Sequence, residues 1–369
     1  MSDSRLARQT AERLIGSRAQ LLKFNCLLGF DGFVDTFFET VQERHSLTKH
    51  TPYASLAAFL KDLSTKKKTL FEIAPAGERI GGDGPLATFA MSTLGAPADY
   101  IGLAGSPSVH PAFSEFAKRA RVHSIGSPGT RSTCIFPDGS QYTLAQSACV
   151  YDVNWDHVKK KVGDKALQKA WHDAHFVGMM SWSRMPHMSA LWKKMLSEIK
   201  VSKEGKRKLI FFDLGDTSER SDAELVAALK IMSEFQVHGD VMLGLNEKEA
   251  LHVAKALRLK NPAKTPKAYA ALAQVMRDKL QLAVVAIHPE AYACGADAEG
   301  EHVVNGPYTA KPRITMGAGA HFDAGFSIGK LLGLGMPHAL QLAVACSGFY
   351  VRHGASPNRE QLVRFLQTL

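Results

Sequence analysis

Short, continuous apolar segments alternate with segments of helical spacing along the second half of the chain. The apolar segments predict buried strands at His175–Met179, Lys208–Asp213, Asp240–Gly244 and Leu282–Ile287. The intervening segments predict helices at Met188–Ile199, Asp222–Phe235, Glu247–Leu257 and Pro266–Leu280. Strands this apolar, separated by helices, are typical of a parallel sheet that helices cover on both faces.

The first half predicts more of the same sheet and adds a hairpin. Strands are expected at Asn25–Gly29 and Ala98–Gly102, and helices at Tyr53–Lys66 and after Gly84. Residues Arg131–Leu144 alternate apolar and polar side chains around a Pro-Asp-Gly turn, which indicates a β-hairpin. Because the chain has no internal repeat and no long linker rich in Pro, Ser or Gly, we expect one continuous domain over residues 1–369.

The composition is that of a globular protein with a large core. Of the 369 residues, 45% are hydrophobic and 22% are charged. No apolar run approaches the roughly 20 residues that span a bilayer, and the N-terminal segment lacks the apolar core of a signal peptide. The expected location is therefore the cytoplasm. The 5 cysteines form no CxxC pair, which argues against a disulfide framework or a zinc cluster.

The net charge of +10 favours anionic ligands such as nucleotide phosphates. The same charge could attract nucleic acid. However, the basic residues lie in short runs such as Lys159-Lys160-Lys161, without interleaved aromatic residues on which bases could stack. A solvated surface explains these runs better, so neither a nucleic acid nor a membrane is an expected partner.

Ligands of parallel α/β sheets bind beyond the carboxyl ends of the strands, and the first candidate motif follows the first strand. In the segment Gly29–Asp35, the carboxylates of Asp31 and Asp35 could accept hydrogen bonds from sugar hydroxyls. The alternative is an Asx turn that binds no ligand.

The second candidate is Gly81–Pro85, which precedes a predicted helix. Adjacent glycines such as Gly82 permit close approach of a ligand to the backbone. Asp83 could cap the helix that Pro85 opens. A glycine-rich turn before a helix is common, so this segment alone does not indicate function.

The third candidate pairs Asn246 with Glu249 where a strand meets a helix. Residues three apart lie on one face of a helix. The two side chains could hold a hydrated Mg²⁺, because that ion keeps several waters and takes few carboxylates. Alternatively, Asn246 caps the helix and Glu249 completes a capping box.

The fourth candidate is Thr315–Phe326, which leads into an apolar helix. The segment Gly317-Ala318-Gly319 would expose backbone N–H groups at the positive end of the helix dipole. Such an anion hole suits the charge on a transferring phosphoryl group. Close helix packing through small residues is the alternative for Ala324 and Gly325, but it explains the glycine turn less well.

These segments together resemble the signatures of PfkB-type, ribokinase-like carbohydrate kinases. Thr315–Phe326 is similar to the family's G-A-G-D-x-F-x-A-G-F, Gly81–Asp83 to its G-G-N, and Asn246–Glu249 to its N-x-x-E. Asp213 lies where the family places a strand-end aspartate. The motifs occur in the family's order over roughly residues 25–355. The resemblance implies a three-layer α/β/α sandwich with a mostly parallel central sheet and a small β lid.

The resemblance also implies that a sugar or nucleoside hydroxyl attacks the γ-phosphate of ATP in the presence of Mg²⁺. By this resemblance the acceptor is held by Asp31, Asp35, Gly82 and Asp83. Asn246 and Glu249 would organise Mg²⁺, through water, and the phosphates. Residues 317–319 would form the anion hole.

ATP would then lie near Thr315, Gly348 and the His353-Gly354 turn. The lid is expected from about residues 33–50 and 128–148, and it would exclude water from the sugar. An exposed lid edge could pair with a second copy, which would give a homodimer.

The sequence departs from the family pattern at two positions. Ala320 replaces the aspartate that serves the family as catalytic base, and loss of a general base costs roughly 10²–10⁴-fold in rate. His321 should point about 100° away around the helix, and Asp323 is displaced about 4.5 Å along it. Turnover is therefore expected to be weak or absent. Asp83 replaces an asparagine, so an acceptor of hydrogen bonds stands where the family has both donor and acceptor.

Three explanations for Ala320 stay open. The chain could be a non-catalytic relative that binds a sugar or nucleotide, or has a regulatory role. It could be a kinase deliberately inactivated by substitution, or an active enzyme that takes its base from elsewhere. The acceptor also stays open among pentoses, hexoses, sugar acids and nucleosides.

Overall fold

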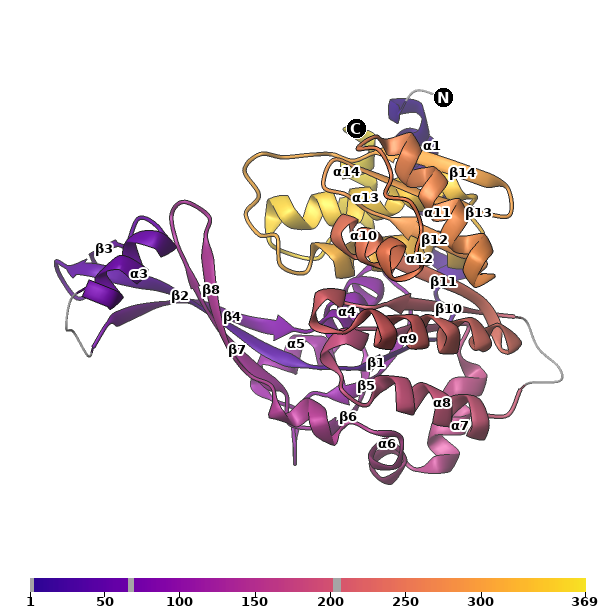
Figure 1. Ribbon diagram of the computed structural model, residues 1–369, viewed down its shortest axis with the longest axis horizontal. Helices are drawn as coiled ribbons and strands as arrows, with labels where there is room; N and C mark the ends of the chain where they lie inside the picture. Colours follow the sequence, from indigo (N-terminus) through magenta and orange to yellow (C-terminus); the bar gives the residue numbers. More distant parts are fainter. Residues whose placement is uncertain (1–2, 66–69, 202–206) are drawn as a thin grey trace.

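Two sheets of unequal size organise the protein (Figure 1). The computed structural model describes residues 3–65, 70–201 and 207–369. The 9-stranded sheet has the order β14-β13-β12-β11-β10-β9-β1-β5-β6, and its pairs are parallel from β6 to β12. Its strands are β1 (Cys26–Phe30), β5 (Ala98–Leu103), β6 (Arg121–Gly126), β9 (Phe176–Met179), β10 (Lys208–Asp213), β11 (Gly239–Leu245), β12 (Val284–Ile287), β13 (Tyr292–Asp297) and β14 (Gly300–Asn305).

Helices cover both faces of this sheet. One face packs against α1 (Asp3–Ile15), α2 (Arg18–Leu21), α4 (Asp83–Leu94), α5 (Ser114–Ala117), α12 (Ala318–Leu331), α13 (Met336–His353) and α14 (Arg359–Gln367). The opposite face packs against α6 (Trp155–Val162), α7 (Asp164–Asp173), α8 (Met188–Glu198), α9 (Asp222–Glu234), α10 (Glu247–Ala256) and α11 (Pro266–Leu280). Short 3₁₀ turns lie at Pro111–Phe113, Ala148–Asp152, Trp182–Arg184, Thr217–Glu219 and Phe235–Val237.

The alternation of side chains along β10 shows how one sheet supports two cores. Phe211 faces α12, where its ring lies 6.3 Å from that of Phe326. Phe212 faces the other way and packs edge-on against Trp192, with ring centroids 4.9 Å apart. Successive strand residues point to opposite faces, so a continuous apolar strand must be covered on both sides. The three-layer α/β/α sandwich with a mostly parallel sheet is confirmed.

The small sheet forms the lid, which projects from the body in Figure 1. Its 5 strands are β2 (Phe33–Arg44), β3 (His50–Pro52), β4 (Glu72–Gly81), β7 (Gly129–Ile135) and β8 (Gln141–Gln146). Strands β2, β7 and β8 fall inside the segments 33–50 and 128–148, whereas β4 lies outside them. The hairpin expected at Arg131–Leu144 is the pair β7–β8.

Helix α3 (Leu56–Thr65) begins later than the sequence pattern predicts. Tyr53 is tied to the sheet because its N–H donates to the carbonyl of Thr40, 3.0 Å away. The Ser55 hydroxyl then accepts the N–H of Ala58 at 3.1 Å, so the helix starts after Ser55. The predicted last residue, Lys66, lies outside the described residues.

The parallel strands place their carboxyl ends along one edge of the large sheet. Asp31 follows β1, Ser181 follows β9, Asp213 ends β10, Asn246 follows β11 and His288 follows β12. Helices α4 and α12 begin at the same edge, where the first N–H groups of a helix have no intrahelical acceptor. The candidate motifs, although distant in sequence, therefore converge there. In the described ranges, the helices are too short or too polar to cross a bilayer.

The lid has an apolar cluster of its own. The ring of Phe59, on α3, lies 5.3 Å from the rings of both Tyr53 and Phe71, and 5.9 Å from that of Phe136. These residues are absent from the two clusters that cover the large sheet. The lid joins the clusters of the body at its base, through Phe33 and Val34 of β2, so we expect the outer part of the lid to loosen without unfolding the body.

We expect Phe59→Ala to speed amide hydrogen exchange in β2, β3 and β7, because loss of the half-buried ring removes its packing against Tyr53, Phe71 and Phe136. Exchange in β10 and β11 should not change. Leu47→Ala, at a lid residue that is 95% exposed, is the control and should change neither region. Equal acceleration in lid and body would contradict an independent lid.

Candidate active site

Asp31 organises the start of α4. Its carboxylate accepts the backbone N–H groups of Asp83 and Gly84 at 2.9 and 3.0 Å, and the Ser181 hydroxyl lies 2.9 Å from it. The side chain is 1% exposed. Burial raises the pKa of Asp31 to about 6, and the charge of Asp83 adds to the shift. Asp31 thus caps a helix and fixes the loop that presents Asp83, while direct sugar binding by Asp31 stays a prediction.

Gly82 and Asp83 form the turn that enters α4. Gly82 has φ 97°, a conformation that favours glycine, and a Cβ there would lie 2.7 Å from Asp31 Oδ2. Asp83 remains partly exposed, and the Ser181 hydroxyl lies within hydrogen-bonding distance of its carboxylate. Asp83 therefore offers a carboxylate to a ligand beyond the sheet edge.

Asp35 lies on lid strand β2 and is fully buried. Arg131 of β7 neutralises it through a bidentate contact, with Nε to Oδ1 at 2.6 Å and Nη2 to Oδ2 at 3.3 Å. The guanidinium also lies 4.6 Å from the centre of the Phe33 ring. The structure thus places Asp35 at the base of the lid, in an ion pair that binds two lid strands together.

A second lid arginine reaches the body. Arg79 of β4 donates from Nη1 to the hydroxyl of Tyr350 at 2.5 Å and from Nη2 to the carbonyl of Met316 at 3.2 Å. These contacts connect the lid to the segment that precedes α12. Arg79 was not predicted from the sequence, because Pro75 and Gly77 interrupt the alternating pattern by which the strand that carries it could be identified.

Carboxyl groups are crowded around Asp213. Its Oδ1 accepts the N–H of Gly215 at 2.8 Å. Burial raises the pKa of Asp213 to about 7, with Asp83 adding to the shift. Burial also raises the pKa of Asp323 well above its ordinary value, and the charges of Asp213 and Glu249 add to it. Burial at this edge of the sheet therefore favours the protonated forms of Asp213 and Asp323.

Asn246 and Glu249 form the capping box that begins α10. Glu249 Oε2 accepts the N–H of Asn246 at 2.9 Å, and Asn246 Oδ1 accepts the N–H of Glu249 at 3.0 Å. The capping box, which was the alternative to a Mg²⁺ site, is thus present. It does not exclude that the same two residues also hold a hydrated Mg²⁺. Glu249 is 7% exposed, and burial followed by the charge of Asp213 raises its pKa.

The same two residues fit a hydrated Mg²⁺. Asn246 Oδ1 and the Glu249 carboxylate are oxygen ligands of the kind that this ion prefers, although Asn246 Nδ2 already donates to Glu249 Oε1 at 2.6 Å, and Asn246 remains partly exposed at the edge of the sheet. The raised pKa of Glu249 reflects negative charge that a nearby cation would relieve.

The N-terminus of α12 has the form of an anion hole. Gly317 has φ 93°, and a Cβ there would lie 3.0 Å from the Tyr350 hydroxyl and 2.9 Å from Leu86. Ala318 and Gly319 remain partly exposed. Because the first N–H groups of a helix lack intrahelical partners, this turn presents donors and the positive end of a 14-residue helix.

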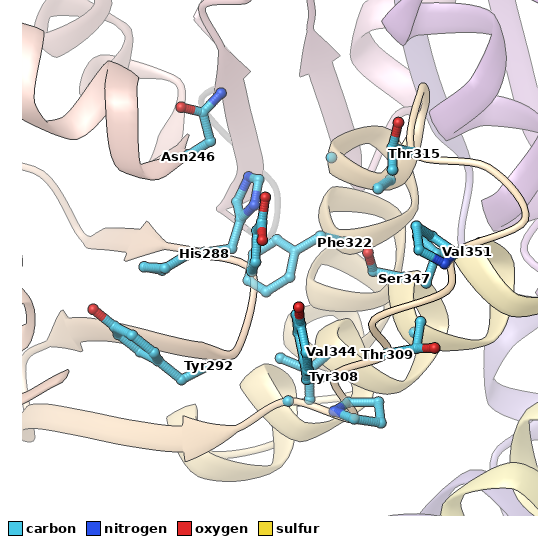
Figure 2. Close-up of a pocket in the computed structure, with 18 of the residues that line it drawn as sticks. Asn246, His288, Tyr292, Tyr308, Thr309, Thr315, Phe322, Val344, Ser347 and Val351 are labelled. Atoms are coloured by element: carbon cyan, nitrogen blue, oxygen red, sulfur yellow. The ribbon is translucent and has the colours of Figure 1, made fainter. Parts of the chain in front are cut away.

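A cavity of about 430 Å³ leads to this turn (Figure 2). Thr315, Ala318, Gly319 and Gly348 line it, as does Asn246 at one end. The other lining residues are His288, Pro289, Glu290, Tyr292, Gly306, Pro307, Tyr308, Thr309, Ala310, Pro312, Phe322, Val344, Ser347 and Val351. His353 and Gly354 are not among them, and His353 instead stacks on Phe349 at 3.9 Å.

His288 is the main feature of this cavity that the sequence analysis missed. It lies between Asn246 and Phe322 in Figure 2 and stacks on Phe322 with ring centroids 4.4 Å apart. Burial lowers the pKa of His288 to about 4, so the ring is neutral near pH 7. Its position after β12 at the same sheet edge was the signal that could have identified it.

Ala320, which stands where the family pattern has its catalytic aspartate, carries only a methyl group and is 2% exposed. His321 turns away, as expected: it stacks on Tyr350 at 3.6 Å and hydrogen-bonds to Gly317 O and Ser356 Oγ, both at 2.7 Å. Asp323 is 3% exposed and lies over the large sheet beside Gly244. The arrangement joins a cavity, an anion hole and a group of carboxylates at one edge of the sheet.

Comparison with known proteins agrees with this arrangement. The family model of prokaryotic ketohexokinase matches residues 7–369. A ketohexokinase of Haloferax volcanii is 26% identical over 358 residues, which cover 96% of this chain and 92% of that protein.

Solved structures show the same fold at low identity. Phosphofructokinase-2 of Escherichia coli, in complex with substrates and products, has a TM-score of 0.63 at 16% identity and covers 94% of this chain and 99% of its own. The nucleoside kinase of Methanocaldococcus jannaschii has a TM-score of 0.62 at 12% identity, with the same coverage of 94% and 99%. The chain belongs to the prokaryotic ketohexokinase family and has the fold of the PfkB/ribokinase-like sugar kinases.

Proposed function

We propose that this protein transfers the γ-phosphoryl group of ATP to a hydroxyl of a ketohexose-like sugar, at a rate limited by alanine at position 320. One observation carries the proposal: Ala318 and Gly319 line the cavity and also begin the helix that bears Ala320 and Asp323. A phosphoryl group at this turn would lie between a nucleotide in the cavity and an acceptor beside the carboxylates. Membership in the ketohexokinase family supports the acceptor class.

The cavity suits a nucleotide, in which a flat apolar base is attached to anionic phosphates. Val344, Gly348 and Val351 of α13 form an apolar wall, and the N-terminus of α12 lies at the cavity's other side. The helix dipole and free N–H groups favour phosphate there. An E. coli protein described as a ribokinase II, solved with ATP and Mg²⁺, has this fold with a TM-score of 0.62 at 16% identity.

The acceptor side is rich in carboxylates. Asp83 is partly exposed and can accept hydrogen bonds from sugar hydroxyls, while Asp31 and the Asp35–Arg131 ion pair hold the loop and the lid around it. Crowded carboxylates repel an acceptor that already carries negative charge. A neutral sugar is therefore favoured over a sugar acid or a sugar phosphate.

Asn246 and Glu249 would hold Mg²⁺ through water, and the ion would neutralise charge on the phosphates. Gly317 and Gly319 would orient the phosphoryl group by backbone N–H donation, whereas the N–H of Ala318 donates to the carbonyl of Thr315 at 3.0 Å. The lid, connected to the body by Arg79, would exclude water so that the sugar hydroxyl is the nucleophile.

Ala320 also favours a second function, a sugar- or nucleotide-binding protein on a kinase fold. Its methyl group cannot accept a proton, and it packs within the apolar cluster that covers one face of the sheet. A cytoplasmic location and a homodimer through the lid edge stay predictions under either function.

We expect Ala320→Asp to raise kcat at least about a hundredfold, because it restores a general base beside the anion hole. Phosphoryl transfer should be assayed with Mg·ATP against a panel of ketohexoses, pentoses, sugar acids and nucleosides. Ala320→Asn is the matched control, since it adds similar bulk without a base and should give no gain. No gain from Ala320→Asp, with ligands still bound, would favour the binding protein.

We expect Ser347→Phe to weaken ADP binding at least about tenfold, since a large side chain on α13 would fill the cavity it lines. Isothermal titration should show this loss, while binding of the sugar is unchanged. Ser197→Phe, at an exposed position of α8, is the control and should leave ADP affinity as it is. Unchanged ADP affinity in Ser347→Phe would place the nucleotide elsewhere.

A further inference from the structure

One contact between the lid and the body ends at the turn that begins α12. Arg79 of β4 donates to the Tyr350 hydroxyl at 2.5 Å and to the carbonyl of Met316 at 3.2 Å, and that hydroxyl donates to the same carbonyl at 2.9 Å. Met316 immediately precedes the turn Gly317–Gly319. We propose that Arg79 and Tyr350 are positioning residues that hold this turn in its phosphate-binding form and couple it to the acceptor turn Gly82–Asp83.

The hydrogen bonds of this contact match the donors and acceptors that its groups possess. The Tyr350 hydroxyl has one proton, which it donates to Met316, and it accepts a hydrogen bond from Arg79. The carbonyl of Met316 has two lone pairs and accepts from both side chains. Arginine can bind two acceptors at once because its N–H groups lie in one rigid plane. The three groups together therefore fix the backbone just before Gly317.

Tyr350 also contacts the turn through a second route. A Cβ at Gly317 would lie 3.0 Å from the Tyr350 hydroxyl, so the hydroxyl occupies space that a side chain would need. The Tyr350 ring stacks on His321 with centroids 3.6 Å apart, and His321 Nδ1 hydrogen-bonds to the carbonyl of Gly317 at 2.7 Å. Tyr350 thus holds Met316 through its hydroxyl and Gly317 through the histidine.

Strand β4 connects Arg79 to the acceptor side of the site. The strand ends at Gly81, directly before the turn Gly82–Asp83, and Arg79 lies two residues before that end. It pairs there with Asp35 of β2, at the base of the lid. A shift of the acceptor turn therefore moves Arg79 and, through it, the carbonyl of Met316. Such a chain of bonded groups can carry coupling between two sites.

The charge of Arg79 has no carboxylate partner in the described part of the chain. Asp35, its neighbour across the two strands, is bound by Arg131 through two contacts. Arg79 Nε is buried without an acceptor among the described residues, and the guanidinium lies 4.9 Å from the centre of the Phe37 ring. A cation beside the positive end of α12 is repelled by it unless an anion lies nearby. This arrangement favours a bound phosphoryl group.

These contacts predict positive coupling between two ligands. An acceptor that orders Gly82–Asp83 also places Arg79, and a γ-phosphoryl group at the turn relieves the repulsion between Arg79 and α12. Each ligand should then raise the affinity for the other by the same factor. The inference rests on the proposed function, because it takes the cavity as the nucleotide site and Asp83 as part of the acceptor site.

Isothermal titration of the full chain measures this coupling. Mg·AMP-PNP, a non-hydrolysable analogue of ATP that carries the γ-phosphoryl group, is titrated with and without saturating D-fructose. We expect fructose to lower the Kd of AMP-PNP at least about fivefold, the lower end of the usual range for coupled sites. ADP lacks the γ-phosphoryl group, so fructose should change its Kd by less than about twofold.

Two substitutions remove the contact. Arg79→Met removes both donors, and Tyr350→Phe removes the hydroxyl but keeps the ring that stacks on His321. We expect each to reduce the effect of fructose on the Kd of AMP-PNP to less than about twofold. The double variant should lose no more coupling than Arg79→Met alone, because both side chains act on one carbonyl. Tyr350→Phe removes a single oxygen, so it tests the role even if Arg79→Met folds poorly.

Matched substitutions elsewhere on the lid are the controls. Arg44→Met removes an arginine whose ion-pair partner is Glu72 of the same sheet, and Tyr142→Phe removes a hydroxyl from a residue that is 42% exposed on β8. Both should keep the coupling of the unsubstituted chain. Thermal melting and the Kd of ADP show that the fold and the cavity persist in Tyr350→Phe, where neither should change.

The outcomes separate this inference from the kinase function. A Kd for AMP-PNP that fructose leaves unchanged, equal coupling for ADP and AMP-PNP, or full coupling in Tyr350→Phe overturns the positioning role. Phosphoryl transfer by Ala320→Asp alongside any of these results leaves the proposed kinase in place. Failure of the chain to bind AMP-PNP or fructose overturns the proposed function and this inference with it.

Discussion

Negative charge gathered at the carboxyl edge of the large sheet is the constraint on which the rest of the site depends. Asp31, Asp83, Asp213, Glu249 and Asp323 come from separate elements, and the parallel strand order brings them together. The protein stabilises this concentration of charge by capping helix starts with Asp31 and Glu249, and burial raises the pKa of both Asp213 and Asp323. A neutral acceptor and a hydrated cation are the ligands that such an edge can accommodate without further repulsion.

Positive charge enters the site from the lid and from the backbone. The charge of Arg131 is neutralised by its ion pair with Asp35. The positive potential therefore comes from the start of α12 and from Arg79, which donates to the carbonyl of Met316 just before that helix. The proposed function therefore puts phosphate at the start of α12 and the acceptor on the acidic side. Under the proposed function the two ligands would meet at the turn Gly317–Gly319, next to Ala320, whose methyl group cannot accept a proton.

Much of this arrangement could be predicted from the sequence, because apolar strands and glycine turns are local signals. The strand Lys208–Asp213 and the helix Pro266–Leu280 match β10 and α11 in both bounds, and Thr315 and Gly348 do lie on the cavity. The signals failed where the chain is irregular. Strand β4 contains Pro75 and Gly77 and pairs with β2 across a register shift, so its alternation is hidden and Arg79 was missed.

Contacts between distant residues were the other limit. The sequence shows Asp323 one turn from Ala320, but nothing local shows that it lies buried beside Gly244 of β11. Likewise, His288 follows a short apolar strand, and only the packing of Phe322 beneath its ring shows that it faces the cavity. Burial and long-range pairing decide the chemistry of both residues. A short window of sequence shows neither the burial nor the pairing.

The most direct measurement is a ³¹P NMR time course of the unsubstituted protein with Mg·ATP and a ketohexose. The account predicts slow growth of a sugar monophosphate resonance that matches the ADP formed, with little inorganic phosphate. Such a result requires an aligned acceptor, a working anion hole and a proton acceptor other than position 320. Binding of both ligands without sugar phosphate over many hours, or release of inorganic phosphate alone, would contradict it.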